Sequence, residues 1–427
     1  MTLKVAVIGG GSTYTPELID GLIQRADRLP VTELCLLDPN LQRVGIVGRF
    51  AQRMCEAAGS NLSVRWTDDP VDAISDAGFV LNQLRVGGQE ARHGDEQMGR
   101  DFGLIGQETT GIGGFAKALR TIPVVLELVR VIETHAPTAT IINFTNPAGL
   151  ITELLVRATN QTVLGLCNVP WNQRADLAAL LEVPFDRIEL DFVGLNHLSW
   201  IRGVTVDGED RTAEALTLAR EQLGKQGAHA EPDWDPETIR VLGAIPSYYM
   251  MYFYETAAML RLQEQQPTRA QEVMKIEHTL LRRYEDESLR EKPPELMERG
   301  GAYYSECAAA LMADIWTDAG ATHVVSTPNA GALPGLPDAV VVETPARIHR
   351  SGPIAVPTHE LRADMDALVR TVKDYELLTI RAATLGDADA ALLALSTNPL
   401  GPRLADAPKV WDRIRTDNAG RLGLLDG

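Results

Sequence analysis

The chain has 427 residues, of which 45% are hydrophobic and 23% charged, a composition typical of a folded globular protein with room for two domains. Its net charge of -18 repels the phosphates of nucleic acids and of anionic lipids. We therefore expect neither nucleic acid nor a membrane as a partner.

The beginning of the chain and its cysteines favour a cytoplasmic protein. Met1 is followed almost at once by an apolar run that predicts a buried strand, not a cleavable signal. No segment approaches the ~18 consecutive apolar residues of a membrane span. The cysteines form no CxxC pair, so neither a zinc knuckle nor a disulfide framework is indicated. They are Cys35, Cys55, Cys167 and Cys307.

The first half alternates short apolar runs with amphipathic stretches. The apolar runs predict strands at residues 4–8, 33–37, 62–66, 79–84, 140–144 and 163–166. The amphipathic stretches predict helices at residues 16–28, 41–58, 115–135 and 148–158. Strands separated by helices imply right-handed crossovers and a parallel, doubly wound α/β sheet.

The pattern changes near residue 187 and becomes mixed α+β. We predict a strand pair at 187–194 and 198–206, a helix at 212–224 and a long helical region from about 244 to 284. Further strands are expected at 323–326 and 339–343, and helices at 360–385 and 387–394. Residues 224–236 and 327–337 are linkers or loops. We divide the chain into residues 1–190 and 191–427.

A glycine-rich turn, Gly-Gly-Gly-Ser-Thr-Tyr at residues 9–14, lies between the first predicted strand and helix. In this position Gly9 and Gly11 let backbone N–H groups approach a pyrophosphate, although Tyr14 replaces the third glycine of the usual fingerprint. Asp38 ends the second strand, where a carboxylate favours NAD over NADP. The alternative is a turn that binds no dinucleotide. The predicted NAD contacts are Gly9, Gly11, Ser12, Thr13 and Asp38.

Two other strand ends carry polar motifs. The segment Asn-Phe-Thr-Asn-Pro at residues 143–147 resembles a turn of lactate and malate dehydrogenases that lies near nicotinamide and substrate. Gly-Leu-Asn-His at residues 194–197 likewise resembles their strand-end histidine. These pieces alone are compatible with a 2-hydroxy-acid dehydrogenase.

Several segments in order resemble glycoside hydrolase family 4. They are residues 8–18, 84–88, 106–111, 143–149, 167–170, 194–197, 245–249 and 299–305. The resemblance spans nearly the whole chain. It implies an NAD-binding Rossmann-like domain related to lactate and malate dehydrogenase over 1–190. It also implies an α+β domain for substrate, metal and oligomerisation over 191–427, in a homodimer or homotetramer.

Within this family, the residue after the cysteine at position 167 separates substrate classes. The 6-phospho-α-glucosidases have an aspartic acid there, and the α-galactosidase and α-glucosidase types commonly have histidine. This chain has Asn168, like 6-phospho-β-glucosidases, and asparagine has no proton to donate as a general acid. The resemblance therefore implies a 6-phospho-β-glucosidase. Alternatives are another family 4 specificity, a net lactate- or malate-type dehydrogenase, and a non-catalytic NAD sensor.

The resemblance also assigns metal and catalytic residues. Cys167 and His197 are the implied ligands of a divalent metal, expected to be Mn²⁺, although each alone is more typical of a buried structural residue. Tyr249 is the implied base, and its phenol needs nearby positive charge to ionise near neutral pH. Glu108 matches the position thought to raise the tyrosine's basicity. Otherwise Tyr249 belongs to an aromatic core and Glu108 orients another group.

Four polar residues match family positions that hold the phosphorylated sugar. Guanidinium groups suit this task because they present paired donors to phosphate oxygens. Each arginine by itself is more typical of a solvated surface. The four residues are Arg92, Asn146, Asn168 and Arg269. Arg85 and Arg299 lie in similar motifs and receive no role.

Most glycosidases use two carboxylates, and the NAD-dependent family is an exception. The resemblance implies oxidation at C3 of the sugar by NAD⁺, followed by removal of the C2 proton by Tyr249. The aglycone is then eliminated, water adds, and C3 is reduced again. The substrate is a phosphorylated disaccharide or aryl glycoside, and no net redox change occurs.

Overall fold

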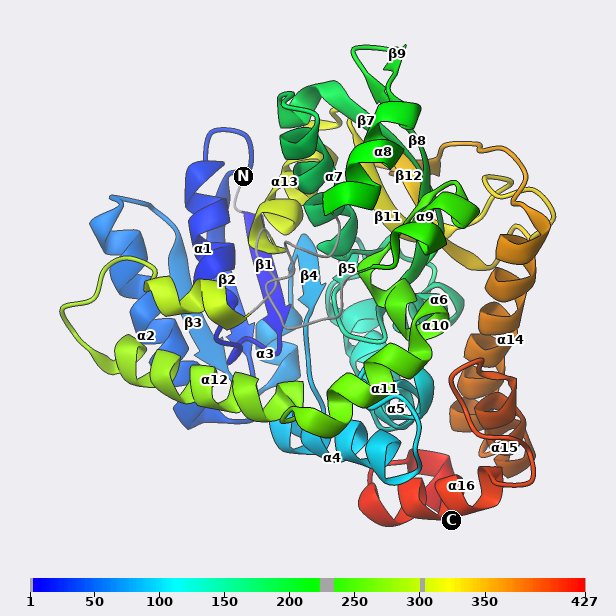
Figure 1. Ribbon diagram of the computed structural model, residues 1–427. Coiled ribbons are helices and arrows are strands. Elements are labelled where there is room, and N and C mark those ends of the chain that lie inside the picture. The colour runs from blue at the N-terminus through cyan, green and yellow to red at the C-terminus, as the bar shows by residue number, and fades with distance from the viewer. Residues whose placement is uncertain (1–2, 223–233, 300–303, 427) are drawn as a thin grey trace.

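The computed structural model describes residues 3–222, 234–299 and 304–426. At its centre lies a nine-stranded sheet with the order β13-β12-β11-β6-β5-β4-β1-β2-β3 (Figure 1). The last six of these strands are parallel, and they correspond to the six strands predicted in the first half. Their order, 3-2-1-4-5-6 by label, is that of doubly wound dinucleotide-binding sheets. The parallel strands are β1 (Leu3–Ile8), β2 (Val31–Leu37), β3 (Ser63–Thr67), β4 (Phe79–Asn82), β5 (Thr140–Asn143) and β6 (Val163–Gly165).

Helices cover both faces of this sheet because its strands are apolar on both sides. Along β1, Val5 and Val7 pack into one core and Ala6 and Ile8 into the other, which is the two-residue alternation of a strand. The first face is covered by α1 (Thr15–Gln24), α2 (Leu41–Ala57), α12 (Arg269–Glu285) and α13 (Tyr304–Thr317). The other face is covered by α3 (Pro70–Ile74), α5 (Gly111–His135), α6 (Ala148–Ala158) and α14 (Ala363–Leu385).

The second half of the chain extends the large sheet and also builds a smaller one. Three antiparallel strands follow β6 in the large sheet: β11 (Thr322–Pro328), β12 (Val341–His349) and β13 (Gly352–Ala355). The small antiparallel sheet contains β7 (Ile188–Leu195), β8 (Leu198–Val206), β9 (Glu209–Asp210) and β10 (Ile245–Pro246). The predicted mixed α+β second half is confirmed, whereas the division at residue 190 stays a prediction.

The region predicted to be helical from about 244 to 284 is helical only from Tyr248 onward, and it is interrupted. The segment is divided into β10, a 3₁₀ turn η2 (Tyr248–Met250), α10 (Met251–Tyr254), α11 (Thr256–Gln265) and α12. Pro267 has no N–H to continue α11, and Thr268 begins α12 with a capping box to Gln271. The predicted linker at 224–236 lies largely outside the described residues.

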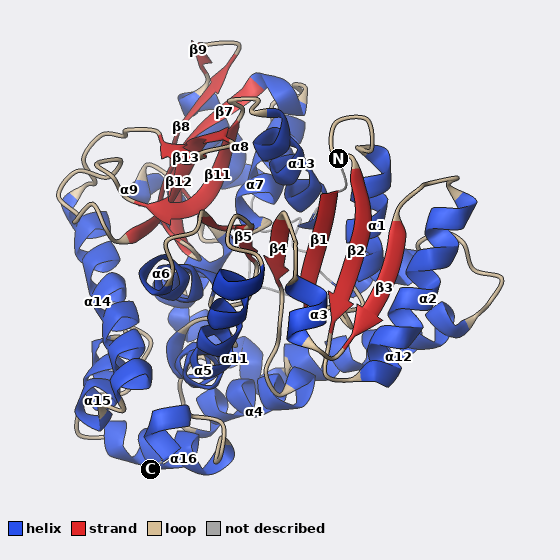
Figure 2. Ribbon diagram, turned by 180° about the vertical axis from the view of Figure 1, so that it is seen from behind, coloured by secondary structure: helices blue, strands red, loops and turns tan. Residues whose placement is uncertain are grey.

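The remaining elements lie around these sheets. They are α4 (Gly88–Asp101), α7 (Val169–Leu180), η1 (Phe185–Arg187), α8 (Thr212–Gln222), α9 (Pro236–Leu242), η3 (Pro294–Arg299), α15 (Ala388–Thr397), α16 (Ala407–Asp417) and η4 (Gly423–Asp426). Figures 1 and 2 show α14, α15 and α16 on the side of the molecule away from α2 and β3. Within the described residues, no helix is both long and apolar enough to cross a membrane.

The parallel strands end at a common edge, where the polar motifs follow them. The glycine-rich turn follows β1, Arg85 comes shortly after β4, Asn146 shortly after β5 and Cys167 shortly after β6. Because parallel α/β sheets bind ligands beyond the carboxyl ends of their strands, this edge is where a functional site is expected.

Candidate active site

The turn after β1 has no room for a side chain at any of its three glycines. Gly9 has φ +85°, and a Cβ there would lie 2.8 Å from the Leu84 Cα atom. Gly11 lies against Asp38, whose Oδ2 accepts a hydrogen bond from the Gly11 N–H at 3.0 Å; a Cβ on Gly11 would lie 2.7 Å from that oxygen. The acidic end of β2 therefore faces the turn, which is the arrangement that a dinucleotide pyrophosphate and ribose require.

The other two predicted NAD contacts differ in accessibility. Ser12 is half-buried, and its hydroxyl accepts a hydrogen bond from the Tyr14 N–H at 3.2 Å. The Thr13 side chain is fully buried, and its backbone carbonyl accepts a hydrogen bond from the Tyr284 hydroxyl at 2.8 Å. Thr13 thus joins the turn to α12, and a contact with NAD would come through its backbone. The residues of the turn fit NAD, and their role in binding it stays a prediction.

Cys167, His197 and Tyr249 meet although they come from three distant segments. Cys167 precedes α7, His197 lies in the turn between β7 and β8, and Tyr249 lies in η2. The Cys167 Sγ atom is 3.5 Å from His197 Nε2. The Tyr249 ring stacks on the His197 imidazole with 3.6 Å between centroids and 10° between planes. A thiol, an imidazole and a phenol therefore share one small volume.

The protonation of the two candidate metal ligands follows from their surroundings. Burial lowers the pKa of His197 to about 3, so the imidazole is neutral and has a free lone pair. Burial and the nearby Glu343 carboxylate raise the pKa of Cys167 to about 12. Backbone N–H groups of Asn168 and Val169, at the start of α7, act against this rise by donating to the sulfur.

The distance between Cys167 and His197 fits a shared metal ion. Sulfur and nitrogen ligands at roughly 2.3 and 2.1 Å from one ion lie about 3 to 3.6 Å apart for ordinary bond angles. The 3.5 Å separation is within this range. The described residues contain no group of three or more His, Cys, Asp or Glu side chains arranged to hold a metal, so an ion on this pair would keep positions open for other ligands.

Glu108 is surrounded by cations. Arg85 forms a two-pronged ion pair with its carboxylate, Lys117 Nζ lies 2.6 Å from Oε2, and Arg92 Nε lies 3.2 Å from Oε1. Burial alone would raise the pKa of Glu108, but Arg85, Arg92 and Lys117 hold it well below its usual value. Glu108 is therefore an anion that contacts three basic side chains. One of them is Arg85, to which the sequence assigned no role.

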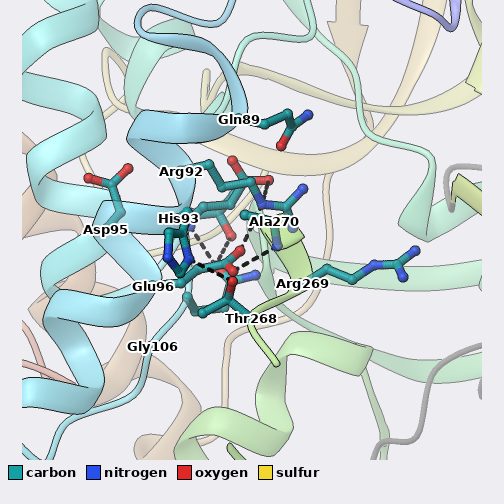
Figure 3. A network of polar contacts seen from close by, with 12 residues as sticks. Gln89, Arg92, His93, Asp95, Glu96, Gly106, Thr268, Arg269 and Ala270 are labelled. Carbon is teal, nitrogen blue, oxygen red and sulfur yellow. Dashed lines mark hydrogen bonds and ion pairs between the residues drawn. The ribbon is translucent and has the colours of Figure 1, made fainter. Parts of the chain in front are cut away.

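Arg92 also belongs to a second network that joins α4 to α12 (Figure 3). Glu96 Oε1 accepts from Arg92 Nε at 2.7 Å, and its Oε2 accepts from the Ala270 N–H at 2.9 Å. His93 Nδ1 lies 2.8 Å from the Thr268 hydroxyl. In Figure 3 the Arg269 side chain extends away from this network, and it pairs with Glu272 at 2.8 Å. The two predicted phosphate-binding arginines thus lie at one helix junction with different partners.

The predicted sugar-binding asparagines both lie where a strand passes into a helix. Asn146 precedes α6, and its side-chain oxygen accepts from the Ala148 N–H at 3.3 Å. Asn168 is the N-cap residue of α7, directly after Cys167. Their contacts with substrate stay predictions. The side chain of Arg299 lies outside the described residues.

The sequence interpretation did not identify Lys117 or Glu96. Lys117 is 2% exposed and lies in a helical stretch of glycines, alanines and apolar residues, where a single lysine was the available signal. Glu96 is 3% exposed but lies among the many polar residues of α4, so nothing in the sequence distinguishes it. Glu96 became apparent through Ala270 on α12, and Lys117 through Glu108 in the segment that precedes its own helix.

Comparison with known proteins covers nearly the whole chain. The model of the family 4 glycosyl hydrolases matches residues 4–183, and that of the family's C-terminal domain matches residues 192–401. The chain is 40% identical over 422 residues to a probable 6-phospho-β-glucosidase of Bacillus subtilis (strain 168), covering 96% of this chain and 95% of the relative.

Solved structures agree with this similarity. The 6-phospho-β-glucosidase of Thermotoga maritima, determined with manganese, NAD⁺ and glucose-6-phosphate, is 36% identical with a TM-score of 0.91 and covers 97% of this chain and 98% of its own. Malate dehydrogenase of Salinibacter ruber, 16% identical with a TM-score of 0.55, covers 90% of this chain and all of its own, and shares the fold alone. The chain belongs to the family 4 glycosyl hydrolases.

Proposed function

We propose that this chain hydrolyses 6-phospho-β-glucosides with the help of bound NAD and a divalent cation, expected to be Mn²⁺. The observation that carries the proposal is the meeting of Cys167, His197 and Tyr249 beside the cations around Glu108. The activity named for the relatives and the presence of Asn168 instead of an acid support the 6-phospho-β class.

NAD and the cation supply chemistry that the side chains lack, and the protein holds both in place. Bound NAD supplies a reversible hydride acceptor, and a bound cation polarises oxygens of the sugar. In our proposal, Cys167 and His197 hold the cation through a sulfur and a neutral nitrogen. The backbone of residues 9–13 and the Asp38 carboxylate hold NAD at the end of β1.

Tyr249 is positioned to take the C2 proton in this proposal. Its ring is held flat against His197, which limits its orientation. Its electrostatic interaction with Arg92 favours the ionised phenol, because a neighbouring positive charge stabilises a phenolate. Glu108 keeps Arg92, Arg85 and Lys117 together and so maintains this positive field. No carboxylate is then required as the base.

The phosphate of the substrate is proposed to bind at the junction of α4 and α12. Arg92 and Arg269 supply guanidinium donors there, and Asn146 and Asn168 supply amide groups for sugar hydroxyls. A substrate without the 6-phosphate would leave the arginines without this partner and is expected to react poorly. Location in the cytoplasm and assembly into a homodimer or homotetramer stay predictions.

A panel of chromogenic glycosides tests the proposed function. Matched α and β anomers in the gluco and galacto series, each with and without a 6-phosphate, are assayed with NAD⁺ and Mn²⁺ under reducing conditions. We expect hydrolysis of 6-phospho-β-glucosides without accumulation of NADH, and deuterium at C2 when the reaction runs in heavy water. Preference for an α or unphosphorylated glycoside would contradict the substrate class, and stoichiometric NADH release would instead support a net dehydrogenase.

A further inference from the structure

Glu343 is a buried carboxylate that pairs with no cation in the part of the chain that the structure describes. It lies on β12, is 2% exposed, and accepts a hydrogen bond from the Asn196 side-chain amide at 2.9 Å. Among the residues that the structure describes, no cation forms an ion pair with it. Burial raises its pKa to about 7. An isolated buried carboxylate is costly, so this position calls for a physical explanation.

Asn196 connects Glu343 to the candidate metal ligands. It directly precedes His197 in the turn between β7 and β8. Its amide donates to Glu343 Oε1, and its side chain lies beside the Cys167 sulfur. Because one oxygen of Glu343 accepts from the amide nitrogen, the carboxylate orients the group that faces Cys167. The strand β12 thereby reaches the two ligands through a single side chain.

The charges at this position would balance when a divalent cation is bound, because metal binding requires Cys167 as a thiolate. A Cys167 thiolate and the Glu343 carboxylate would place two negative charges in a buried region, and the imidazole of His197 is neutral. One divalent cation between Cys167 and His197 would neutralise both. Side chains around metal ligands orient them and adjust the charge of a site in this way.

We propose that Glu343 is a positioning residue of the metal site: it orients Asn196 against Cys167 and supplies negative charge that balances the bound divalent cation. This inference rests on the proposed function, because it assumes that Cys167 and His197 bind the metal. It extends that function to two residues, Glu343 and Asn196, that do not themselves contact the ion.

A second buried carboxylate offers a matched control. Glu376 on α14 is 5% exposed, but it pairs with Lys373 at 2.5 Å, and Lys373 also contacts Glu153 at 3.0 Å. Removal of one charge from such a paired group destabilises the fold. Removal of the charge of Glu343 instead takes away a buried charge that no described cation offsets, and glutamine retains an oxygen that accepts from Asn196. The two substitutions should therefore have opposite effects.

The experiment compares the full chain with Glu343→Gln, Asn196→Ala and Glu376→Gln variants. Mn²⁺ binding is measured by isothermal titration with NAD⁺ present, and thermal unfolding is measured after the metal has been removed. We expect Glu343→Gln and Asn196→Ala to weaken Mn²⁺ binding by about tenfold or more. Without metal, Glu343→Gln should have an unfolding temperature no lower than that of the wild type. Glu376→Gln should have a lower unfolding temperature and bind Mn²⁺ within about twofold of wild-type affinity.

Several outcomes would overturn the inference. Wild-type Mn²⁺ affinity in either Glu343→Gln or Asn196→Ala would show that the connection to Cys167 is not needed. A lower unfolding temperature for metal-free Glu343→Gln would make Glu343 an ordinary stabilising residue. If Glu343→Gln does not fold, the Glu343 carboxylate is required for stability, and the inference fails. A wild-type chain that bound no Mn²⁺ would overturn the proposed function, and this inference with it.

Discussion

At the scale of single residues, Cys167 has the clearest consequence for function. Substitution by serine replaces a soft thiolate with a poorly ionised hydroxyl at the same place. Loss of residues around a ligand already costs 10- to 100-fold in metal affinity, so we expect Cys167→Ser to weaken Mn²⁺ binding by at least about 100-fold and to abolish hydrolysis. Metal titration and the glycoside assay measure this. NAD⁺ binding should be retained, and Cys55→Ala on α2 should leave Mn²⁺ affinity unchanged.

Lys117 is expected to make stability depend on pH. Burial and the Arg85 charge lower its pKa to about 7 in the folded chain, against 10.5 for an ordinary lysine. The unfolded chain therefore binds more protons between these two values, and the free energy of unfolding rises with pH across this window. The penalty for burying the charged lysine is complete below pH 7 and is lost above about pH 10.5.

The Lys117→Met variant isolates this contribution. Urea unfolding of both proteins at several pH values from 7 to 10 should show the wild type gaining stability relative to the variant as the pH rises. A difference between the two proteins that stays constant with pH would mean that Lys117 keeps an ordinary pKa, with Glu108 compensating its burial.

The sequence predicted the residues that carry motifs and missed those that support them. Cys167, His197 and Tyr249 were identified because their segments resemble a family, although no pattern in one dimension shows that they meet. Glu343 interrupts an apolar strand, which is a visible signal, but its partner Asn196 lies 147 residues away. Contacts over such separations depend on the fold and are invisible to local periodicity.

At the scale of elements, the start of α12 fixes the position of Arg269. Thr268 caps this helix, is 1% exposed, and also contacts His93 on α4. We expect Thr268→Ala to lower the free energy of unfolding by about 1 to 2 kcal/mol, the range for loss of an N-cap. Denaturant unfolding measures the change. Thr279→Ala, on the exposed side of the same helix, is the control and should change stability by less than about 0.5 kcal/mol.

The elements of the first half were predictable because the pattern of buried residues in each strand and helix is regular. Parallel strands covered on both faces appear as continuous apolar runs, and the helices between them have one apolar side. In contrast, α4 was missed because it is highly polar; several of its buried side chains, such as Gln89 and Glu96, are held by partners on α12. The breaks within 244–284 were missed although Pro267 was visible in the sequence.

At the scale of the whole molecule, the two halves depend on each other through the large sheet. Without β11, the edge of β6 would present unpaired backbone groups, and without α14 one face of the sheet would lose part of its cover. We expect a fragment of residues 1–190 to aggregate, whereas the full chain should elute as a single species of defined size, the predicted homodimer or homotetramer. Size-exclusion chromatography of both at equal concentration tests this. A monomeric fragment with a cooperative unfolding transition would show that the first half folds independently.

The position of β12 has a consequence for the order of events during synthesis. On the ribosome, Cys167 emerges early, but β12 with Glu343 follows only after more than 170 further residues have been translated. A nascent chain that has already folded its first strands would therefore present the thiol without its complete surroundings. Tight uptake of manganese would then wait until translation is nearly finished.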